Sequence, residues 1–343
     1  MRLQGIDVAR FIAFLGMVLV NFRIAAQVTT DADFPTLVTN SLEGRAAALF
    51  VILAGVGFTM GHVSGRQPWH LTLRRAVFLF IIGMLDMVMF DADILHFYAL
   101  YFLVGMLFTQ ASGRMLLLGA GAITLIGYIA LFAFDFENGW NFETFKYVDF
   151  WSVSGFLRHS FYNGWHPVFP WAALLLIGMW VGRLDLAARG TQLRLLIWGG
   201  ILATTTSLAS KTLGSLDPEL IEIVSTAPIP PTPFYILAGS GSAIAMLGLI
   251  LLITPTLTRL HLTNILAAPG KMSLTLYMAH IYLGMGILEG VGKLDGSLST
   301  YDIFAISLGF CVIAALFARL WFIKFRRGPL EGLMRLTTEG KVR

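Results

Sequence analysis

Charged residues are scarce in this 343-residue chain: Asp, Glu, Lys and Arg make up 13% of it, against 57% hydrophobic residues. This composition excludes an ordinary soluble globule, in which about 25% of residues are charged, and it excludes the disordered classes. Cysteine is nearly absent as well. The lone Cys311 lies in an apolar segment, so the chain forms no intrachain disulfide and no redox role is indicated.

Several motifs of soluble enzymes are missing. The sequence has no G-x-S-x-G elbow, no H-E-x-x-H pair, no phosphate-binding loop and no cysteine cluster. These absences argue against a hydrolase, a metalloprotease, a nucleotide-driven ATPase and a zinc protein. The histidines are scattered along the chain, so we expect no metal site and no bound cofactor.

Apolar runs long enough to cross a bilayer occupy most of the chain. A hydrocarbon core of about 30 Å needs roughly 20 residues of helix. We therefore predict an all-α integral membrane protein, a single polytopic helical bundle of about ten transmembrane helices. The expected spans lie near residues 8–25, 46–62, 74–90, 94–110, 114–134, 168–186, 193–210, 233–254, 271–291 and 303–323.

The distribution of charge predicts the orientation. With the N-terminus inside, the cytoplasmic loops receive most Lys and Arg residues and the outer loops receive most acidic residues. Both termini are then cytoplasmic, and the cations on the cytoplasmic side include Arg2, Arg66, Lys341 and Arg343. The net charge of +4 follows from this topology, so we expect the lipid bilayer as partner and no nucleic acid. The sequence indicates no particular oligomeric state.

The longest connection, residues 135–167, lies on the outer side in this topology and is rich in aromatic residues. Loops of this length are often binding elements or lids. Aromatic residues beside a membrane are also common interfacial anchors. We keep both interpretations, a lid over a site and an interfacial segment.

The first apolar segment carries three polar residues, Asp7, Arg10 and Asn21, which are costly in lipid and should face the protein interior. Asp7 and Arg10 are three residues apart and can pair. Alternatively, Arg10 binds an anionic donor such as the phosphates of an acyl coenzyme A. Asn21 lies about 16 Å further along the helix, near the outer leaflet, where its amide could polarise a carbonyl or bond a neighbouring helix.

Titratable residues cluster where the third span leads into the fourth. The third span contains Asp86, and Asp93 and His96 stand three apart at the start of the fourth. Asp93 can cap that helix and also orient the imidazole. A carboxylate that holds a histidine is suited to general-base catalysis of acyl transfer, although capping alone would also explain Asp93. We consider Asp86 a candidate substrate-binding residue.

Three further residues are candidates. His280 is expected close to the middle of the membrane. An ionisable group at this depth is a candidate functional residue by default. The alternative is that His280 is neutral and hydrogen-bonded to a neighbouring helix. His166 precedes an outer helix entrance, and Arg45 begins the second span on the outer side. His166 either binds substrate or simply lies at the membrane interface. Arg45 either binds substrate or anchors its helix.

Five segments, in this order, resemble the bacterial membrane family called domain of unknown function 418. They are Ile6–Arg10 with Gly16–Asn21, Glu43–Phe50 with Gly55–Phe58, Asp93–Tyr98, Gly270–Tyr277 and Phe325–Glu331. That family is similar to the heparan-alpha-glucosaminide N-acetyltransferase group and, more remotely, to the acyltransferase-3 membrane proteins. The resemblance implies a bacterial inner-membrane location and transfer of acyl groups from cytosolic donors across the bilayer.

The resemblance carries over to the residues only in part. Asn21 matches an asparagine at the outer end of the first helix in the acetyltransferase group. The histidine that follows it in that group has no counterpart between Arg23 and Pro35. Asp86 stands where many relatives have histidine, and the position of His280 is glutamine in some and histidine in others. Catalysis therefore needs a different base from the one in that group.

Our leading hypothesis is a membrane acyltransferase with acyl coenzyme A as co-substrate and a sugar or glycolipid as acceptor. His96 or His280 would be the base and Asp93 its orienting carboxylate. Asn21 would polarise the carbonyl. Arg10 would bind the donor, and Arg45, His166 and Asp86 the substrate. The alternatives are a small-molecule transporter, because intramembrane charges also line permeation paths, and a noncatalytic membrane protein.

Overall fold

The computed structural model describes residues 3–29, 31–63, 65 and 68–340, and these are almost entirely helical. The elements, in chain order, are α1 (Gln4–Ala25), α2 (Phe34–Leu42), α3 (Arg45–Val63), α4 (Trp69–Asp86), α5 (Leu95–Leu107), α6 (Gly113–Ala133), β1 (Trp140–Asn141), β2 (Lys146–Tyr147), α7 (Val153–Arg158), η1 (His159–Asn163), α8 (Val168–Val181), α9 (Arg189–Leu216), η2 (Pro218–Leu220), α10 (Pro233–Arg259), α11 (Thr263–Lys271), α12 (Ser273–Ala279), η3 (His280–Met285), α13 (Gly286–Gly290), α14 (Thr300–Lys324) and α15 (Pro329–Glu339). The all-α prediction is confirmed, because the only strands described are the two-residue β1 and β2.

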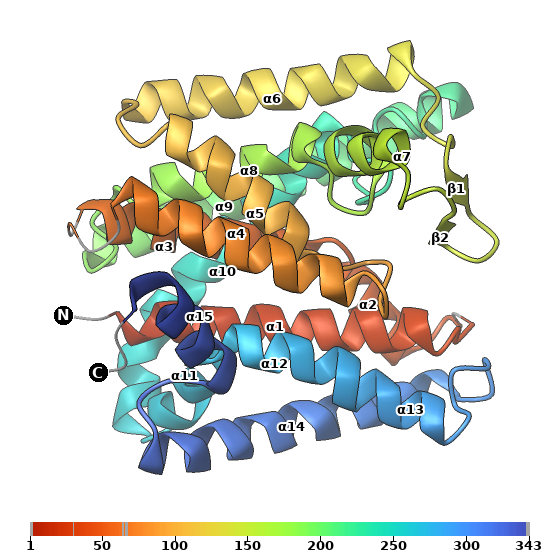
Figure 1. The fold of residues 1–343 in the computed structure, drawn as a ribbon. Helices are drawn as coiled ribbons and strands as arrows, with labels where there is room; N and C mark the ends of the chain where they lie inside the picture. Colours follow the sequence, from red (N-terminus) through yellow and green to blue (C-terminus); the bar gives the residue numbers. More distant parts are fainter. Residues whose placement is uncertain (1–2, 30, 64, 66–67, 341–343) are drawn as a thin grey trace.

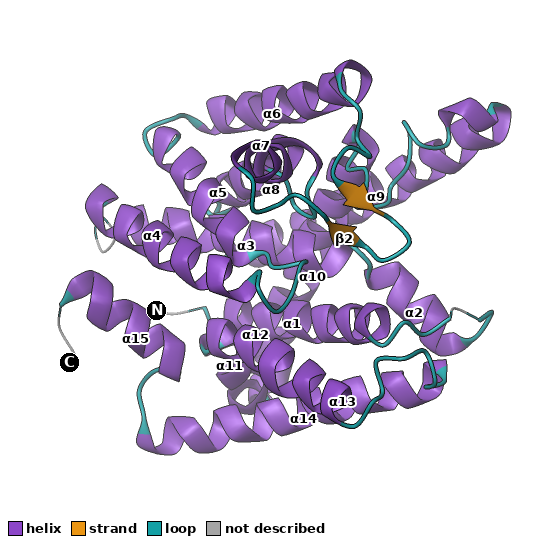
Figure 2. Ribbon diagram, turned by 45° about the vertical axis from the view of Figure 1, so that its right-hand side comes forward, coloured by secondary structure: helices purple, strands orange, loops and turns teal. Residues whose placement is uncertain are grey.

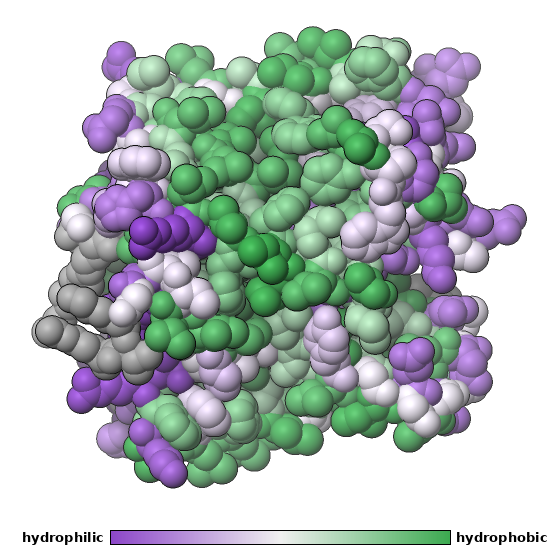
Figure 3. Space-filling model, viewed as in Figure 1, coloured by the Kyte–Doolittle hydropathy of each residue, from purple (hydrophilic) through white to green (hydrophobic). Residues whose placement is uncertain are grey.

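The long helices lie side by side and run across the molecule in roughly the same direction (Figure 1). The start of α1 and the helix α15 lie at the same end of this bundle. Apolar residues cover the middle of the surface, and hydrophilic residues gather at its two ends (Figure 3). This pattern is typical of a membrane protein, in which the apolar middle zone contacts lipid and the two polar ends contact water.

Among the described residues, six helices are long and apolar enough to cross a membrane: α1, the α2–α3 unit, α6, α9, α10 and α14. The pair formed by α7–η1 and α8 is bent by 48° and makes a seventh crossing if counted as one span. Three other predicted spans correspond to shorter or interrupted helices, namely α4, α5 and the α12–η3–α13 unit. Of the predicted cytoplasmic cations, Arg2, Arg66, Lys341 and Arg343 lie outside the described residues.

Close helix contacts in the core depend on glycine. A Cβ added at Gly178 of α8 would lie 2.2 Å from the carbonyl oxygen of Ile52, and one added at Gly55 of α3 would lie 2.2 Å from that of Leu175. The backbones of α3 and α8 therefore touch at positions where only glycine fits. At Gly270 of α11 an added Cβ would lie 1.8 Å from the carbonyl oxygen of Asp7, which fixes α11 against α1.

Residues 135–167 are an ordered segment and not a structureless loop. They contain the β1–β2 hairpin, in which Trp140 pairs with Tyr147, followed by α7 and the π-helical turn η1. The hairpin and α7 lie beside each other at the end of the bundle opposite the start of α1 (Figures 1 and 2). This segment covers the candidate site described next.

Candidate functional site

Asp93 and His96 form a buried pair at the start of α5. Both side chains have 0% exposure. Asp93 Oδ2 accepts hydrogen bonds from the His96 backbone N–H at 3.0 Å and from the His96 ring nitrogen Nδ1 at 2.8 Å. The predicted capping and orienting contacts are therefore both present. With Nδ1 donating to the carboxylate, Nε2 carries the lone pair, and it is buried with no hydrogen-bond partner among the described residues.

Tyr277 of α12 holds the other side of the carboxylate. Its hydroxyl donates to Asp93 Oδ1 at 3.1 Å and accepts the backbone N–H of Ile94 at 3.1 Å. Both oxygens of Asp93 thus have partners on α5 or α12, which fixes the orientation of the carboxylate. Sequence reasoning did not assign a role to Tyr277, although it belongs to one of the five family-like segments.

Glycine at position 83 lets α4 approach this pair. A Cβ added there would lie 2.3 Å from the backbone nitrogen of His96 and 2.8 Å from Asp93 Oδ2. Asp86, three residues later, is fully buried, and its carboxylate interacts with the Tyr282 hydroxyl. Asp86 interacts electrostatically with Asp93. The structure thus brings Asp86, Asp93 and His96 into one buried cluster.

His159 and His166 of the 135–167 segment complete the surroundings of His96. The ring of His159 stacks on that of His96 with 5.7 Å between centroids, and His166 lies 5.8 Å from the ring of Phe97. Both nitrogens of His159 and Nδ1 of His166 are buried without a partner among the residues described. His159 was missed from sequence, because nothing distinguished it from the other ring side chains of its loop.

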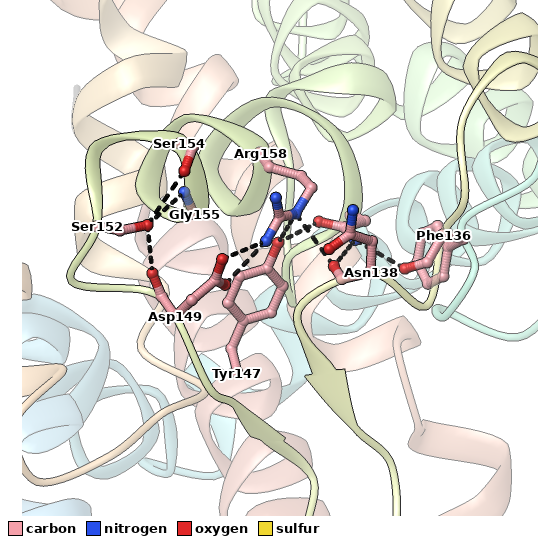
Figure 4. Close-up of polar contacts among 9 residues, drawn as sticks. Phe136, Asn138, Tyr147, Asp149, Ser152, Ser154, Gly155 and Arg158 are labelled. Carbon is pink, nitrogen blue, oxygen red and sulfur yellow. Dashed lines mark hydrogen bonds and ion pairs between the residues drawn. The ribbon is translucent and has the colours of Figure 1, made fainter.

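A polar network fixes the fold of this segment (Figure 4). Arg158 Nη2 makes a bidentate contact with Asp149 at 2.8 and 2.7 Å, and Arg158 Nε donates to the Tyr147 hydroxyl at 2.8 Å. Tyr147 donates to Asn163 Oδ1 at 2.7 Å. Partial burial raises the pKa of Tyr147, so the hydroxyl stays protonated and can donate. The network ties β2 to α7 and η1, which carry His159.

Asn21 and His280 form a separate pair. Asn21 Nδ2 lies 3.2 Å from His280 Nε2, and His280 Nδ1 bonds the carbonyl oxygen of Tyr277. Both ring nitrogens of His280 therefore have protein partners. The sequence placed these two residues at different depths, but they lie side by side. α11 already lies inside the bundle against the start of α1, and His280 follows it further toward the Asn21 end of α1.

Arg10 lies at the opposite end of α1 from Asn21. Its Nη1 pairs with Asp7 Oδ1 at 3.2 Å, so the predicted pair is present. Gly57 leaves room for the guanidinium, because a Cβ there would lie 3.0 Å from Arg10 Nη2. Arg45 lies elsewhere, over the ring of Tyr235, and is not part of the cluster around His96.

A cavity of about 310 Å³ lies between Arg10 and the Asp93 pair. At one end it is lined by Arg10, Arg75 and Glu331, and at the other by Ile94 and Tyr277, next to Asp93. Its middle is mostly apolar. No three His, Cys, Asp or Glu side chains of the described chain are grouped as metal ligands.

Two family models match the sequence. The model described as heparan-alpha-glucosaminide N-acetyltransferase, catalytic, matches residues 2–213, and the model described as protein of unknown function (DUF418) matches residues 168–341. The first match includes Asp93 and His96, and the second includes Tyr277 and His280. None of the curated proteins searched matches the chain.

Proposed function

Because the chain belongs both to the heparan-alpha-glucosaminide N-acetyltransferase catalytic family and to the DUF418 family, we propose that it moves an acetyl group from a cytosolic acetyl coenzyme A to a sugar or glycolipid acceptor across the membrane. The family resemblance expected from the sequence is confirmed by both matches. The assignment to membrane acetyltransferases follows from the family, and the donor, the acceptor and the direction of transfer are our proposal.

The observation that supports catalysis is the unpartnered Nε2 of His96, held by Asp93 through the opposite ring nitrogen. This geometry suits a general base. In the proposed reaction, His96 Nε2 takes the proton of the acceptor hydroxyl or amine. The oxygen or nitrogen of the acceptor then attacks the acetyl carbonyl carbon. The bond from carbonyl carbon to sulfur breaks, and the leaving thiolate takes up a proton. His280 suits this role less, because both of its nitrogens are already bonded.

The cavity between Arg10 and Tyr277 supports a place for the donor. Arg10 and Arg75 offer guanidinium groups for the phosphates of coenzyme A. The apolar middle suits the pantetheine arm, and the thioester would then lie near Tyr277. Tyr98 also lines this cavity, and its hydroxyl is buried without a partner in the described structure. It is therefore available to donate a hydrogen bond to the acetyl carbonyl.

The acceptor side is closed in this conformation. His96 has no exposed surface, and the 135–167 segment covers it through His159 and Phe150. An acceptor can reach Nε2 only if this segment moves. We therefore assign the segment as a lid, which must open for each turnover.

The same proposal includes the topology. The six long helices, the bent pair, α4, α5 and the α12–η3–α13 unit would make ten crossings of a bacterial inner membrane, with both termini in the cytoplasm. This orientation puts the Arg10 end of the cavity in the cytosol, where acetyl coenzyme A is available. Reporter fusions after residues 110 and 139 would test it, with a cytoplasmic signal expected for the first and an outer signal for the second.

The proposed activity is tested by incubating the purified protein with labelled acetyl coenzyme A and an envelope glycan fraction. We expect label in the glycan fraction, its loss in His96→Ala and its retention in His70→Ala, because His70 is exposed near the start of α4. Absence of acceptor labelling would refute transfer. Solute accumulation in proteoliposomes without covalent change would instead establish the transporter alternative.

A further inference from the structure

A second cavity, of about 490 Å³, lies between α1, α3, α9 and α10. It shares no lining residue with the donor cavity among the described residues. The contact of Gly16 with Ala46 separates the two, because a Cβ added at Gly16 would lie 2.9 Å from that of Ala46. This second cavity therefore has no part in the transfer proposed above.

The lining is charged at one end, whereas α1 contributes only the apolar Ile12 and Ala13. At the outer-loop end the cavity is lined by Ser41, Arg45 and Lys211. At the deep end it is lined by apolar residues, among them Ala203 and Met246. From Lys211 to Ala203 is eight residues of α9, which is about 12 Å of helix. The cavity is thus an amphipathic groove with its cations at one end.

Its two cations have no acidic partner in the described structure. Arg45 Nη1 is buried without a hydrogen bond, and the guanidinium lies over the Tyr235 ring at 5.8 Å. Lys211 is exposed and forms no ion pair with any described residue. A buried guanidinium nitrogen without an acceptor is costly, so an anionic group between Arg45 and Lys211 would satisfy it.

The groove is open to the side. Thr204, Leu208 and Lys211 are exposed and follow one another along one face of α9, at spacings of four and three residues. In a membrane this face meets lipid. A molecule that diffuses within the bilayer can therefore enter with its chain along the apolar part and its head at the cations.

We propose that this groove binds an anionic phospholipid of the outer leaflet. The phosphate lies between Arg45 and Lys211, and one acyl chain runs along α9 and α10 toward Met246. Charge complementarity at one end and apolar walls below it select a lipid over a soluble anion. The site would be a lipid-binding site separate from the acyl-transfer centre.

The test uses the full chain purified in detergent and titrated with phosphatidylglycerol, with bound lipid counted by native mass spectrometry. We expect one retained phosphatidylglycerol per chain. Lys211→Gln should bind about fivefold more weakly, the loss expected for one interfacial cation, and Arg45→Gln should bind more weakly still. Lys293→Gln, an exposed cation between α13 and α14, should bind like the unchanged protein.

Two parallel titrations distinguish the sources of phosphate. Phosphatidylcholine has the same chains but a zwitterionic head, and inorganic phosphate has no chain, so both should bind much more weakly. Equal retention of phosphatidylcholine, or binding of phosphate alone at the same concentration, would overturn the proposal. A dimer that excludes lipid from the groove would also overturn the proposal. So would phosphatidylglycerol binding by Lys211→Gln equal to that of the unchanged protein. This second variant tests the groove even if Arg45→Gln does not fold.

Discussion

Tyr277 contacts both the Asp93–His96 pair and the Asn21–His280 pair, because its hydroxyl donates to Asp93 while its carbonyl oxygen bonds His280. Tyr277 of α12 therefore helps to fix the orientation of two histidines, the candidate base His96 on α5 and His280, which contacts Asn21 of α1. It also lines the end of the donor cavity next to Asp93. A change at this residue should affect catalysis through Asp93.

Tyr277→Phe removes the hydroxyl and leaves Asp93 Oδ1 and the Ile94 N–H without their partner. A buried group without its hydrogen bond costs about 1 to 3 kcal/mol. We expect kcat to fall about tenfold, which is ~1.4 kcal/mol, with little change in KM for the donor. Steady-state acetyl transfer and thermal unfolding check this. Unchanged kcat and unfolding temperature would contradict the role assigned to Tyr277.

The choice between two histidines can be tested with the same substitution. His280→Gln keeps a donor for the Tyr277 carbonyl and an acceptor for the Asn21 amide, so transfer should stay within a few-fold of the unchanged rate. His96→Gln removes the general base and should lower the rate by about 10²- to 10⁴-fold. Single-turnover measurements compare the two variants. The reverse order of effects would make His280 the base.

Gly83→Ala should disturb the site through packing alone. The added methyl group meets the backbone of His96 and the carboxylate of Asp93, so α4 must move away. Overpacking of this kind costs about 1 to 3 kcal/mol, and we expect lower stability together with lower activity. The matched control is Gly121→Ala in α6, where no atom lies within 4 Å of the added Cβ. That variant should be neutral or slightly more stable.

The sequence predicted the parts of the fold that depend on periodicity and composition. The apolar runs predicted a helical membrane protein, and the spacing of three between Asp93 and His96 predicted their contact. Both are local properties of the chain. The same holds for Asp7 and Arg10.

What the sequence did not reveal are contacts between distant segments. Asn21 and His280 are 259 residues apart, and they meet because Gly270 places α11 against α1. His159 reaches His96 only through the fold of the 135–167 segment. No periodicity of the sequence encodes such a contact, so His159 and His96 appeared unrelated. The interrupted helix α12–η3–α13 was also predicted as one continuous span, because composition does not show a π-helical turn.

The lid assignment predicts that tethering the 135–167 segment stops turnover. Phe80 of α4 and Phe156 of α7 have ring centroids 6.1 Å apart, so cysteines at these two positions can be joined by a short cleavable bismaleimide. The native Cys311 is buried and should not react. We expect the cross-linked protein to lose transfer and to regain it after cleavage. Full activity of the cross-linked form would exclude lid movement, and each single cysteine variant serves as control.

Glu331 of α15 gives a pH dependence that can be measured without substrate. Its carboxylate accepts the backbone N–H groups of Leu274 and Thr275 at 2.8 and 3.2 Å, and the Thr275 hydroxyl at 2.6 Å. Burial nevertheless raises the pKa of Glu331 above its model-compound value of 4.5. α15 follows the last long helix and closes the Arg75 end of the donor cavity.

A raised carboxyl pKa means that the folded protein binds the proton more tightly than the unfolded chain does. The contribution of Glu331 to stability is therefore largest below pH 4.5 and decreases as the pH rises through its folded-state pKa. Glu331→Gln does not titrate, so its unfolding temperature should lack this decrease. The difference between variant and unchanged protein should then grow in favour of the variant from pH 4.5 upward. Parallel curves over this range would show that burial does not hold the proton on Glu331.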